Sequence, residues 1–486
     1  MSTKRKKRKN DRDLAQWFFV GLGFLLIFIG PSSQALTLDD YLTQVKKQNL
    51  DYQSGTEKAE GYLLQSREAD LTFAPDFFAD ATLGEDEKPT SPHYYDSLKT
   101  QTYNVGFEQT FRFGLEAKLY YQLMETKFIN PNPLLTDAQY WDATPQLELT
   151  LPLWGGGFGR SDQANQTIAR QQNLAQKYSS QAEALNTLAQ AESTYWRLSV
   201  AREVLNIQEK ALTAAQDIYN YVSKKMRMNL GEKADVIQAQ ALLDSRQLEL
   251  QRARNEERAA QREFNKFLHR DAFAPVENLD PIDYARLEKF SLPQERPGTR
   301  ADVKAVEAQT ETAKAQALLS YEKNRPTLDL FGKFALYGRN EKLQSAFEQS
   351  GRRDYDADYV GVRFKMPLHF GAAGDVKSGA KQLEKAWEIN KEQAFYLQEQ
   401  DWIYLTQTLE DARKNLELSS KMETTQKEKL ATERVRFHQG RTTTYQVLLF
   451  EQDYSQAAIS KAKSAAQILD LLTQVQLYQN SGRNSL

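Results

Sequence analysis

Apolar and polar residues alternate along four short stretches of the chain, and this pattern predicts β-strands with one apolar and one polar side. The stretches are 76–83, 146–153, 327–337 and 359–368. In the second of them, leucines at odd positions alternate with Gln146, Glu148 and Thr150. Ionised residues on one side and apolar residues on the other are typical of transmembrane barrel strands, although a soluble β-sandwich alternates in the same way.

A longer run of the same alternation predicts an additional hairpin at 101–124. Ten apolar residues from Tyr103 to Leu123 all occupy odd positions. One strand of that length would extend roughly 70 Å, which is too tall for a membrane barrel. A three-residue turn at Arg112-Phe113-Gly114 preserves the parity and puts Gly114 where a left-handed backbone is needed. We therefore expect six strands instead of four, with outward-facing loops at 84–100, 124–140 and 338–356.

Two segments, 158–228 and 374–438, contain no proline and show the apolar spacing of long helices. A helix of about 70 residues would extend roughly 100 Å. In the helix expected after the first of them, Val236, Leu243 and Leu250 recur at seven-residue spacing. A soluble coiled coil would contain the same helices, so the strands must decide between the two architectures.

The chain contains a unit of strands followed by a long helix twice. Leu151-Pro152-Leu153-Trp154-Gly155-Gly156 matches Met366-Pro367-Leu368-His369-Phe370-Gly371, and each run opens a long helical stretch that ends at a glycine. We expect a first repeat at 36–270, with strands at about 73–154 and a tip turn near 229–233. A proline-containing linker at 271–300 leads into a second repeat at 301–482, with strands at about 326–338 and 357–370 and a tip turn near 438–443.

Residues 1–35 resemble a secretory signal peptide: a basic start precedes an apolar run from Trp17 to Ile29 and a small-x-small site at Ser33-Gln34-Ala35. A retained anchor helix is the alternative, but the run is shorter than the ~20 residues that span a bilayer. Removing this segment, which holds seven Lys/Arg and two Asp/Glu, changes the net charge from −2 to −7. An acidic mature chain argues against nucleic acid as a partner, and the lack of cysteine excludes disulfides and thiolate metal sites.

With these features in order, the sequence resembles the TolC family of outer-membrane efflux proteins over nearly all of 36–482. Leu36-Thr37-Leu38-Asp39-Asp40-Tyr41-Leu42 is similar to the opening helix of that family, and Gly231-Glu232-Lys233-Ala234-Asp235-Val236 to the segment after its first tip turn. The resemblance implies an α+β membrane protein, in which a trimeric transmembrane β-barrel continues into a long periplasmic α-helical barrel. It also implies a Gram-negative outer membrane and its lipid as surroundings. The partners would be a periplasmic adaptor protein and an inner-membrane pump or a type I secretion ABC transporter.

The same resemblance places a gate at the helix tips. Several members carry an aspartate pair in the second repeat, but here the matching stretch is Gln446-Val447-Leu448-Leu449. The candidate tip residues are Gly231, Asp235, Gly440, Arg441, Tyr445 and Gln446. Each glycine could equally be an ordinary helix C-cap, and Asp235 a solvated acid that interacts with a helix dipole. Trp154, at the end of a strand, is a candidate membrane-interface anchor.

The sequence contains no pattern that predicts an enzyme, a cofactor or a metal site. Gly155-Gly156-Gly157-Phe158-Gly159 follows a strand, but Arg160 stands where a dinucleotide-binding motif has its third glycine. The main alternative to a channel is a coiled-coil periplasmic adaptor or envelope tether.

Overall fold

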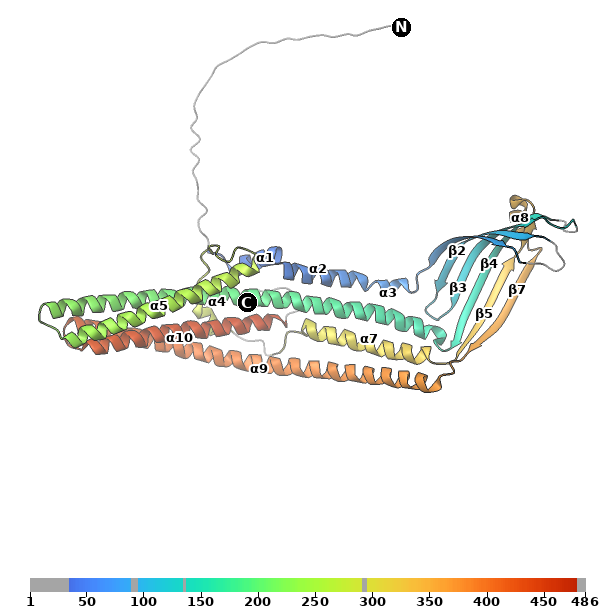
Figure 1. Ribbon diagram of the computed structural model, residues 1–486. Coiled ribbons are helices and arrows are strands. Elements are labelled where there is room, and N and C mark those ends of the chain that lie inside the picture. Colours follow the sequence, from blue (N-terminus) through green and yellow to red (C-terminus); the bar gives the residue numbers. More distant parts are fainter. Residues whose placement is uncertain (1–34, 89–94, 134–136, 291–294, 479–486) are drawn as a thin grey trace, which may run out of the picture.

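The computed structural model describes residues 35–88, 95–133, 137–290 and 295–478. The expected signal peptide therefore lies outside the described residues, apart from Ala35. The described chain is elongated, with one β-sheet at one end and long helices that run away from it (Figure 1). None of the helices described is both long enough and apolar enough to cross a bilayer.

The sheet is antiparallel, with the order β1-β2-β3-β4-β5-β7, and β6 pairs with the upper part of β4. Its strands are β1 (Asp76–Asp86), β2 (Ser97–Thr110), β3 (Glu116–Ile129), β4 (Gln139–Trp154), β5 (Thr327–Leu336), β6 (Gly338–Asn340) and β7 (Asp356–Lys365). The hairpin expected at 101–124 corresponds to β2 and β3, which are paired from Thr110 opposite Glu116 to Ser97 opposite Ile129. Phe111 N–H donates to the Leu115 carbonyl at 2.8 Å around the three-residue turn. Gly114 adopts φ +85°, as the turn requires.

The register of the strands puts most of the apolar residues of the six long strands on one face of the sheet; Phe78 and Phe331 are exceptions. Phe77 lies opposite Phe107, Leu119 opposite Leu147, and Leu330 opposite Val362. Many of these side chains are exposed in the single chain; Phe107 is 57% exposed and Val362 63%. A face this apolar and this exposed needs an apolar environment.

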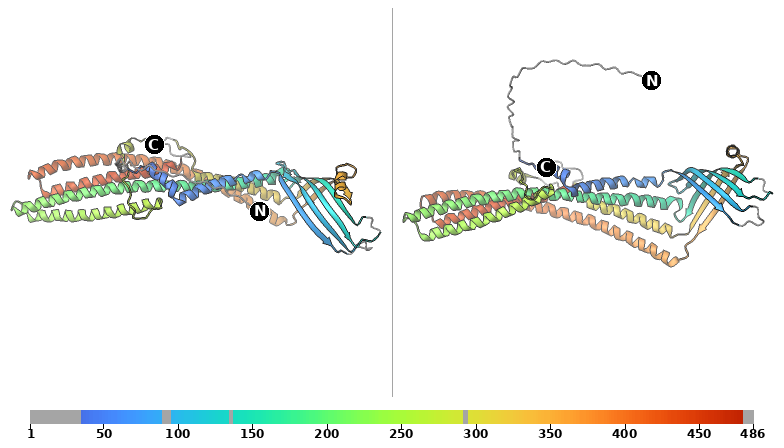
Figure 2. Two further views of the ribbon diagram at one scale, coloured as in Figure 1. Left: turned by 90° about the horizontal axis from the view of Figure 1, so that it is seen from above. Right: turned by 45° about the horizontal axis from the view of Figure 1, so that its top comes forward.

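The opposite face of the sheet is polar and carries cross-strand contacts. Lys333 forms an ion pair with Glu148 at 3.0 Å, and the Tyr120 hydroxyl donates to the same carboxylate at 2.8 Å. Farther along, Asn104 donates to Asp80 at 2.8 Å. The six long strands form one continuous sheet (Figure 2), with mainly apolar residues on one face and mainly polar residues on the other.

The region expected as a loop at 338–356 contains β6 and the helix α8 (Leu343–Ser350). α8 packs onto the sheet because Ser350 hydrogen-bonds the Tyr121 hydroxyl at 2.6 Å and Phe347 stacks on the Tyr121 ring. Gly338 allows the close approach, since a Cβ there would lie 2.0 Å from the Ala346 carbonyl oxygen. The second-repeat strand expected to reach residue 370 ends at Lys365, where its partner Thr327 follows Pro326. Proline has no N–H with which to extend the ladder.

Two helices dominate the rest of the chain, α4 (Arg160–Arg227) and α9 (Phe370–His438), of 68 and 69 residues. The other helices are α1 (Leu38–Gln48), α2 (Leu50–Gln65), α3 (Glu68–Leu71), α5 (Lys233–Phe267), α6 (Tyr284–Lys289), α7 (Ala301–Lys323) and α10 (Thr444–Gln476). Near the sheet, α4 packs between α2 and α7, and α7 packs against α9. Towards the far end, α5 packs on α4, α4 on α10, and α10 on α9. The helices thus form a curved wall four wide at both levels (Figures 1 and 2).

The wall is thickest at mid-length, where α1 and the linker cover α4 and α5. Tyr41, Tyr195 and Phe264 are fully buried there, and the rings of Tyr41 and Phe264 stack with centroids 4.3 Å apart. Small residues fill many other buried helix positions, which lets long helices approach closely.

Candidate functional site

The two helix turns farthest from the sheet lie side by side and form one end of the molecule (Figure 1). Ile218 and Val222 of α4 and Ala239 of α5 share a buried cluster with Phe437 of α9 and Val447 of α10. The Tyr221 ring also contacts Phe437, with centroids 5.1 Å apart. We call this end, residues 224–235 and 433–446, the tip.

Both turns of the tip use the same backbone geometry. The N–H of Leu230 donates to the Lys225 carbonyl at 2.9 Å, and that of Arg441 donates to the Arg436 carbonyl at 2.8 Å. These are the closing bonds of a helix that ends on a left-handed residue.

The left-handed residue of the second turn is Gly440, with φ +70°, so the expected glycine cap is correct there. In the first turn the left-handed residue is Asn229, with φ +57°, and Gly231 does not have a positive φ. The alternative role of Gly231, an ordinary cap of the first helix, therefore falls to Asn229. Asparagine tolerates this conformation better than other residues that carry a Cβ. Asn229 and Gly440 each lie four positions before the first residue of the following helix.

The structure brings the six candidate tip residues to this one end of the chain. Asp235 and Gln446 are each the third residue of their helix, α5 and α10, and so occupy equivalent places in the two repeats. The Gln446 N–H donates to the side chain of the N-cap Thr443 at 3.3 Å. Arg441 and Tyr445 are exposed, and Tyr445 keeps 60% of its surface accessible.

Two carboxylates behind the second turn belong to the tip as well, and the sequence analysis missed both. Glu433 is buried, accepts a hydrogen bond from the Thr442 hydroxyl and pairs with Arg436 at 3.3 Å. Glu451 is also buried and pairs with Arg434 at 2.6 Å. Arg436 lies three positions after Glu433, a spacing that brings two side chains together on one helix and could have been noticed in the sequence. Arg434 lies seventeen positions before Glu451, and no helical spacing rule joins that pair.

A second group of polar contacts lies where the sheet meets the helices. Glu322 near the end of α7 is 2% exposed and accepts from the Gly156 N–H at 2.9 Å. Arg160 and Arg325 pair with the same carboxylate at 3.3 and 3.2 Å. Burial raises the pKa of Glu322, but the N–H and the two guanidinium groups outweigh it and hold the pKa below its usual value. This contact, which we call the junction, ties the start of α4 to the end of α7.

Trp154 lies beside the junction at the end of β4. Its side chain is 43% exposed, and the Arg325 guanidinium lies 6.0 Å from its ring. The ladder between β4 and β5 shifts register between Pro152 and Trp154, which is the mark of a β-bulge. Trp154 is thus at the boundary between sheet and helices, where an interface anchor is expected.

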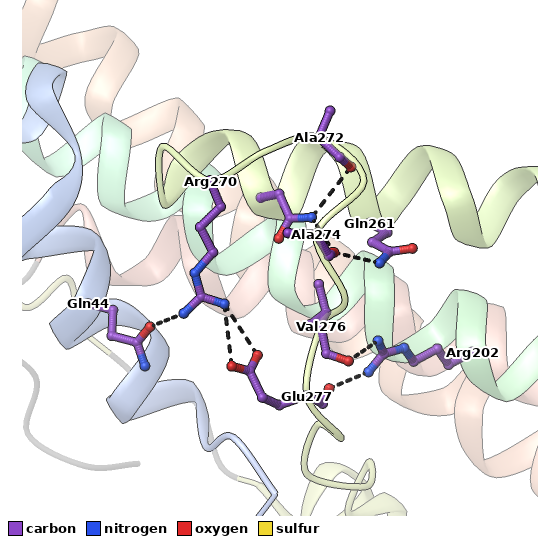
Figure 3. A network of polar contacts seen from close by, with 9 residues as sticks. Gln44, Arg202, Gln261, Arg270, Ala272, Ala274, Val276 and Glu277 are labelled. Carbon is purple, nitrogen blue, oxygen red and sulfur yellow. Dashed lines mark hydrogen bonds and ion pairs between the residues drawn. The ribbon is translucent and has the colours of Figure 1, made fainter.

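The linker is fixed to the wall by a polar network at mid-length (Figure 3). Arg270 pairs with Glu277 at 3.3 Å and donates to Gln44 of α1 at 2.7 Å. Arg202 of α4 donates to the carbonyls of Val276 and Glu277 at 2.9 and 2.6 Å. These contacts hold the linker against α1, α4 and α5.

Comparisons with known proteins agree with this architecture. Residues 112–268 match the sequence model of the family described as outer membrane efflux protein. Among curated protein sequences, none matches the chain.

Several solved structures share the fold. The Vibrio cholerae outer membrane protein VceC has 14% identity and a TM-score of 0.61, over 92% of this chain and 96% of its own. The Neisseria gonorrhoeae MtrE outer membrane channel has 16% identity and a TM-score of 0.61, over 91% and 88%. The Campylobacter jejuni CmeC outer membrane channel has 16% identity and a TM-score of 0.57, over 92% and 87%. These matches confirm the resemblance to TolC-type outer-membrane efflux proteins.

Proposed function

We propose that three copies of this chain form a channel in the outer membrane of a Gram-negative cell, with a long helical tube in the periplasm. The channel is a passive exit duct for a tripartite efflux or type I secretion system. A periplasmic adaptor protein and an inner-membrane pump or ABC transporter complete that system. The family match and the shared fold support the efflux-channel part of this proposal.

The sheet supports the barrel. Within the described residues, β1 pairs with β2 alone and β7 with β5 alone, so both edges of the sheet are open. Open edges are not tolerated in lipid, whereas a closed barrel pairs every strand. Three chains joined β7 to β1 give eighteen long strands. Their apolar face contacts lipid and their polar face lines the pore.

The width of the barrel agrees with the width of the tube. Strands about 4.8 Å apart and tilted by about 40° each occupy roughly 6 Å of wall, so six strands occupy roughly 37 Å. Four packed helices at about 9 Å occupy roughly 36 Å. The extra hairpin β2–β3 therefore makes the barrel as wide as the tube, where four strands would leave a constriction.

The helices support the trimer. Leu50 and Leu64 of α2 and Leu71 of α3 are exposed at multiples of seven, with Glu57 at the position between the first two. On the other flank of the wall, Leu383, Leu397 and Tyr404 of α9 are exposed at multiples of seven. Such stripes are the seams of coiled coils. The α9 flank of one copy would pack on the α2 flank of the next.

The tip is the proposed gate. Around the closed end, Asp235 and its equivalent Gln446 of each copy would face the same residues of the other two copies, with Arg441 and Tyr445 beside them. Exposed hydrogen bonds and ion pairs contribute about 0–1 kcal/mol each, so adaptor docking can shift the tip between a closed and an open packing.

The observation that carries the proposal is the single apolar face on a sheet with two open edges. The test is to express the full chain with its leader in a Gram-negative host and separate the membranes. We expect a detergent-extracted trimer from the outer membrane, eighteen strands by electron cryomicroscopy, and conductance in planar bilayers. A lone rod that stays in solution without detergent would contradict the proposal and favour the adaptor or tether alternative.

A further inference from the structure

The tip carries more cationic than anionic side chains. In residues 224–235 and 433–446, together with the paired Glu451, there are seven Lys/Arg and four Asp/Glu, a net charge of +3 with histidine neutral. The cations are Lys224, Lys225, Arg227, Lys233, Arg434, Arg436 and Arg441; the carboxylates are Glu232, Asp235, Glu433 and Glu451. The mature chain as a whole has the opposite sign, −7 without residues 1–35. The positive charge is therefore a local feature of this end.

The structure separates these charges by depth. Glu433 and Glu451 are buried, whereas the Arg436 and Arg434 side chains that pair with them are 57% and 48% exposed. Each pair is neutral overall, so the net charge of the surface is set by the other residues. Lys224, Arg227, Lys233 and Arg441 are exposed, as is Glu232, while Lys225 and Asp235 are half-buried.

A buried cation lies in the wall above the tip. Arg246 of α5 is 7% exposed, and its Nε and one Nη have no hydrogen-bond partner in the described part of the chain. It lies thirteen residues after Lys233, so it is about 20 Å along the helix. A charge with little solvent around it is screened less than one on the surface.

We infer that the periplasmic mouth of the channel favours anionic solutes, so that its cargo bears carboxylate, phosphate or sulfate groups. The inference rests on the proposed trimeric channel. Three copies place a net charge of about nine around one opening, where the Debye length is ~8 Å at physiological ionic strength. Rings of Arg and Lys are the usual lining of anion and phosphate pores. The field raises the local concentration of anions at the mouth.

The test measures reversal potentials of the purified trimer in planar bilayers under a potassium chloride gradient. We expect chloride to be more permeant than potassium in the unmodified protein. The triple variant Lys224→Gln, Arg227→Gln, Arg441→Gln removes three exposed cations per chain, and the permeability ratio of anion to cation should fall about threefold or more. The single variant Arg227→Gln should shift the ratio in the same direction.

The matched control neutralises three exposed lysines in the half of the wall next to the sheet: Lys58→Gln, Lys323→Gln and Lys385→Gln. It changes the total charge equally, and the ratio should stay near that of the unmodified protein. A cation-selective unmodified channel, or equal ratios in the triple variant and the control, would overturn the inference and leave the channel intact. Absence of any conductance would overturn the proposed function itself, and the inference with it. Should the triple variant not assemble, Arg227→Gln decides by the same criterion.

Discussion

Glu322 offers the sharpest test of how the sheet and the helices are held together. Its carboxylate is buried, and it receives one backbone N–H and one guanidinium group from the start of α4 and a second guanidinium group from the end of α7. Glu322→Ala removes the acceptor and leaves all three donors in place. We expect a clear loss of stability, because a buried donor without a partner costs more than a lost surface contact.

The size of the expected loss in the free energy of unfolding follows from how exposed each partner of Glu322 is. The Gly156 N–H is buried with the carboxylate, and leaving it unsatisfied costs about 1–3 kcal/mol. Arg160 is 54% exposed and Arg325 25%, so water replaces much of their interaction and each contributes about 0.5–1 kcal/mol. The variant should therefore lose roughly 2–5 kcal/mol in the free energy of unfolding.

The junction also predicts a pH dependence. Because the pKa of Glu322 is lower in the folded chain than in the unfolded chain, the folded state favours the ionised form. The stabilisation is fully present above the pKa of the unfolded carboxyl. It is lost as the pH falls through the lower pKa of the folded one. Glu322→Ala should remove this part of the acid sensitivity.

The assay is denaturant unfolding of the protein in detergent, followed by circular dichroism at neutral and acidic pH. The control is Glu311→Ala on the same helix, whose side chain is 43% exposed and pairs with Lys314 at 3.0 Å. It should cost less than about 1 kcal/mol. Equal losses for the two variants would refute the reasoning that burial makes the junction strong.

Three further predictions concern the turns and the tip. Gly114→Ala should reduce the yield of assembled trimer on native gels, because the φ of Gly114 is +85° and a Cβ there would lie 2.4 Å from the Gly159 nitrogen. The control is Gly371→Ala, whose added Cβ meets nothing within 4 Å and which should assemble normally. Gly440→Ala should lower the free energy of unfolding by about 1 kcal/mol, because residue 440 has a left-handed backbone. Asn229→Gly, at the equivalent position, should leave the free energy of unfolding unchanged or raise it slightly. A destabilising Asn229→Gly together with a neutral Gly440→Ala would contradict the capping argument. Asp235→Ala should lower cation permeability in planar bilayers, and an unchanged reversal potential would remove this residue from the gate.

Much of the sheet was readable from the sequence because its signal is local. Parity along a strand shows in consecutive residues, and the turn at Arg112-Phe113-Gly114 follows from keeping that parity across a hairpin. The helix α8 was not anticipated. It is eight residues long, and what holds it is the contact of Phe347 and Ser350 with Tyr121, more than two hundred positions away.

The polar contacts were the least accessible part. Glu322 interacts with Gly156 and Arg160, more than 160 positions away in the sequence, so no spacing rule could join them. Asn229 was overlooked because Gly231 stands two residues later and is the commoner left-handed residue. The tip position was readable from the repeat, whereas the ion pair between Arg434 and Glu451 depended on how α9 and α10 pack.

The two long helices differ by one residue in length, although the first repeat carries the additional strands β2 and β3. The insertion is therefore confined to the outer end of the molecule. Because a hairpin adds one ascending and one descending strand, removing it would leave β1 and β4 antiparallel and able to pair. In the proposed channel, the bore of the barrel can thus be changed in whole hairpins, while the tip keeps its dimensions.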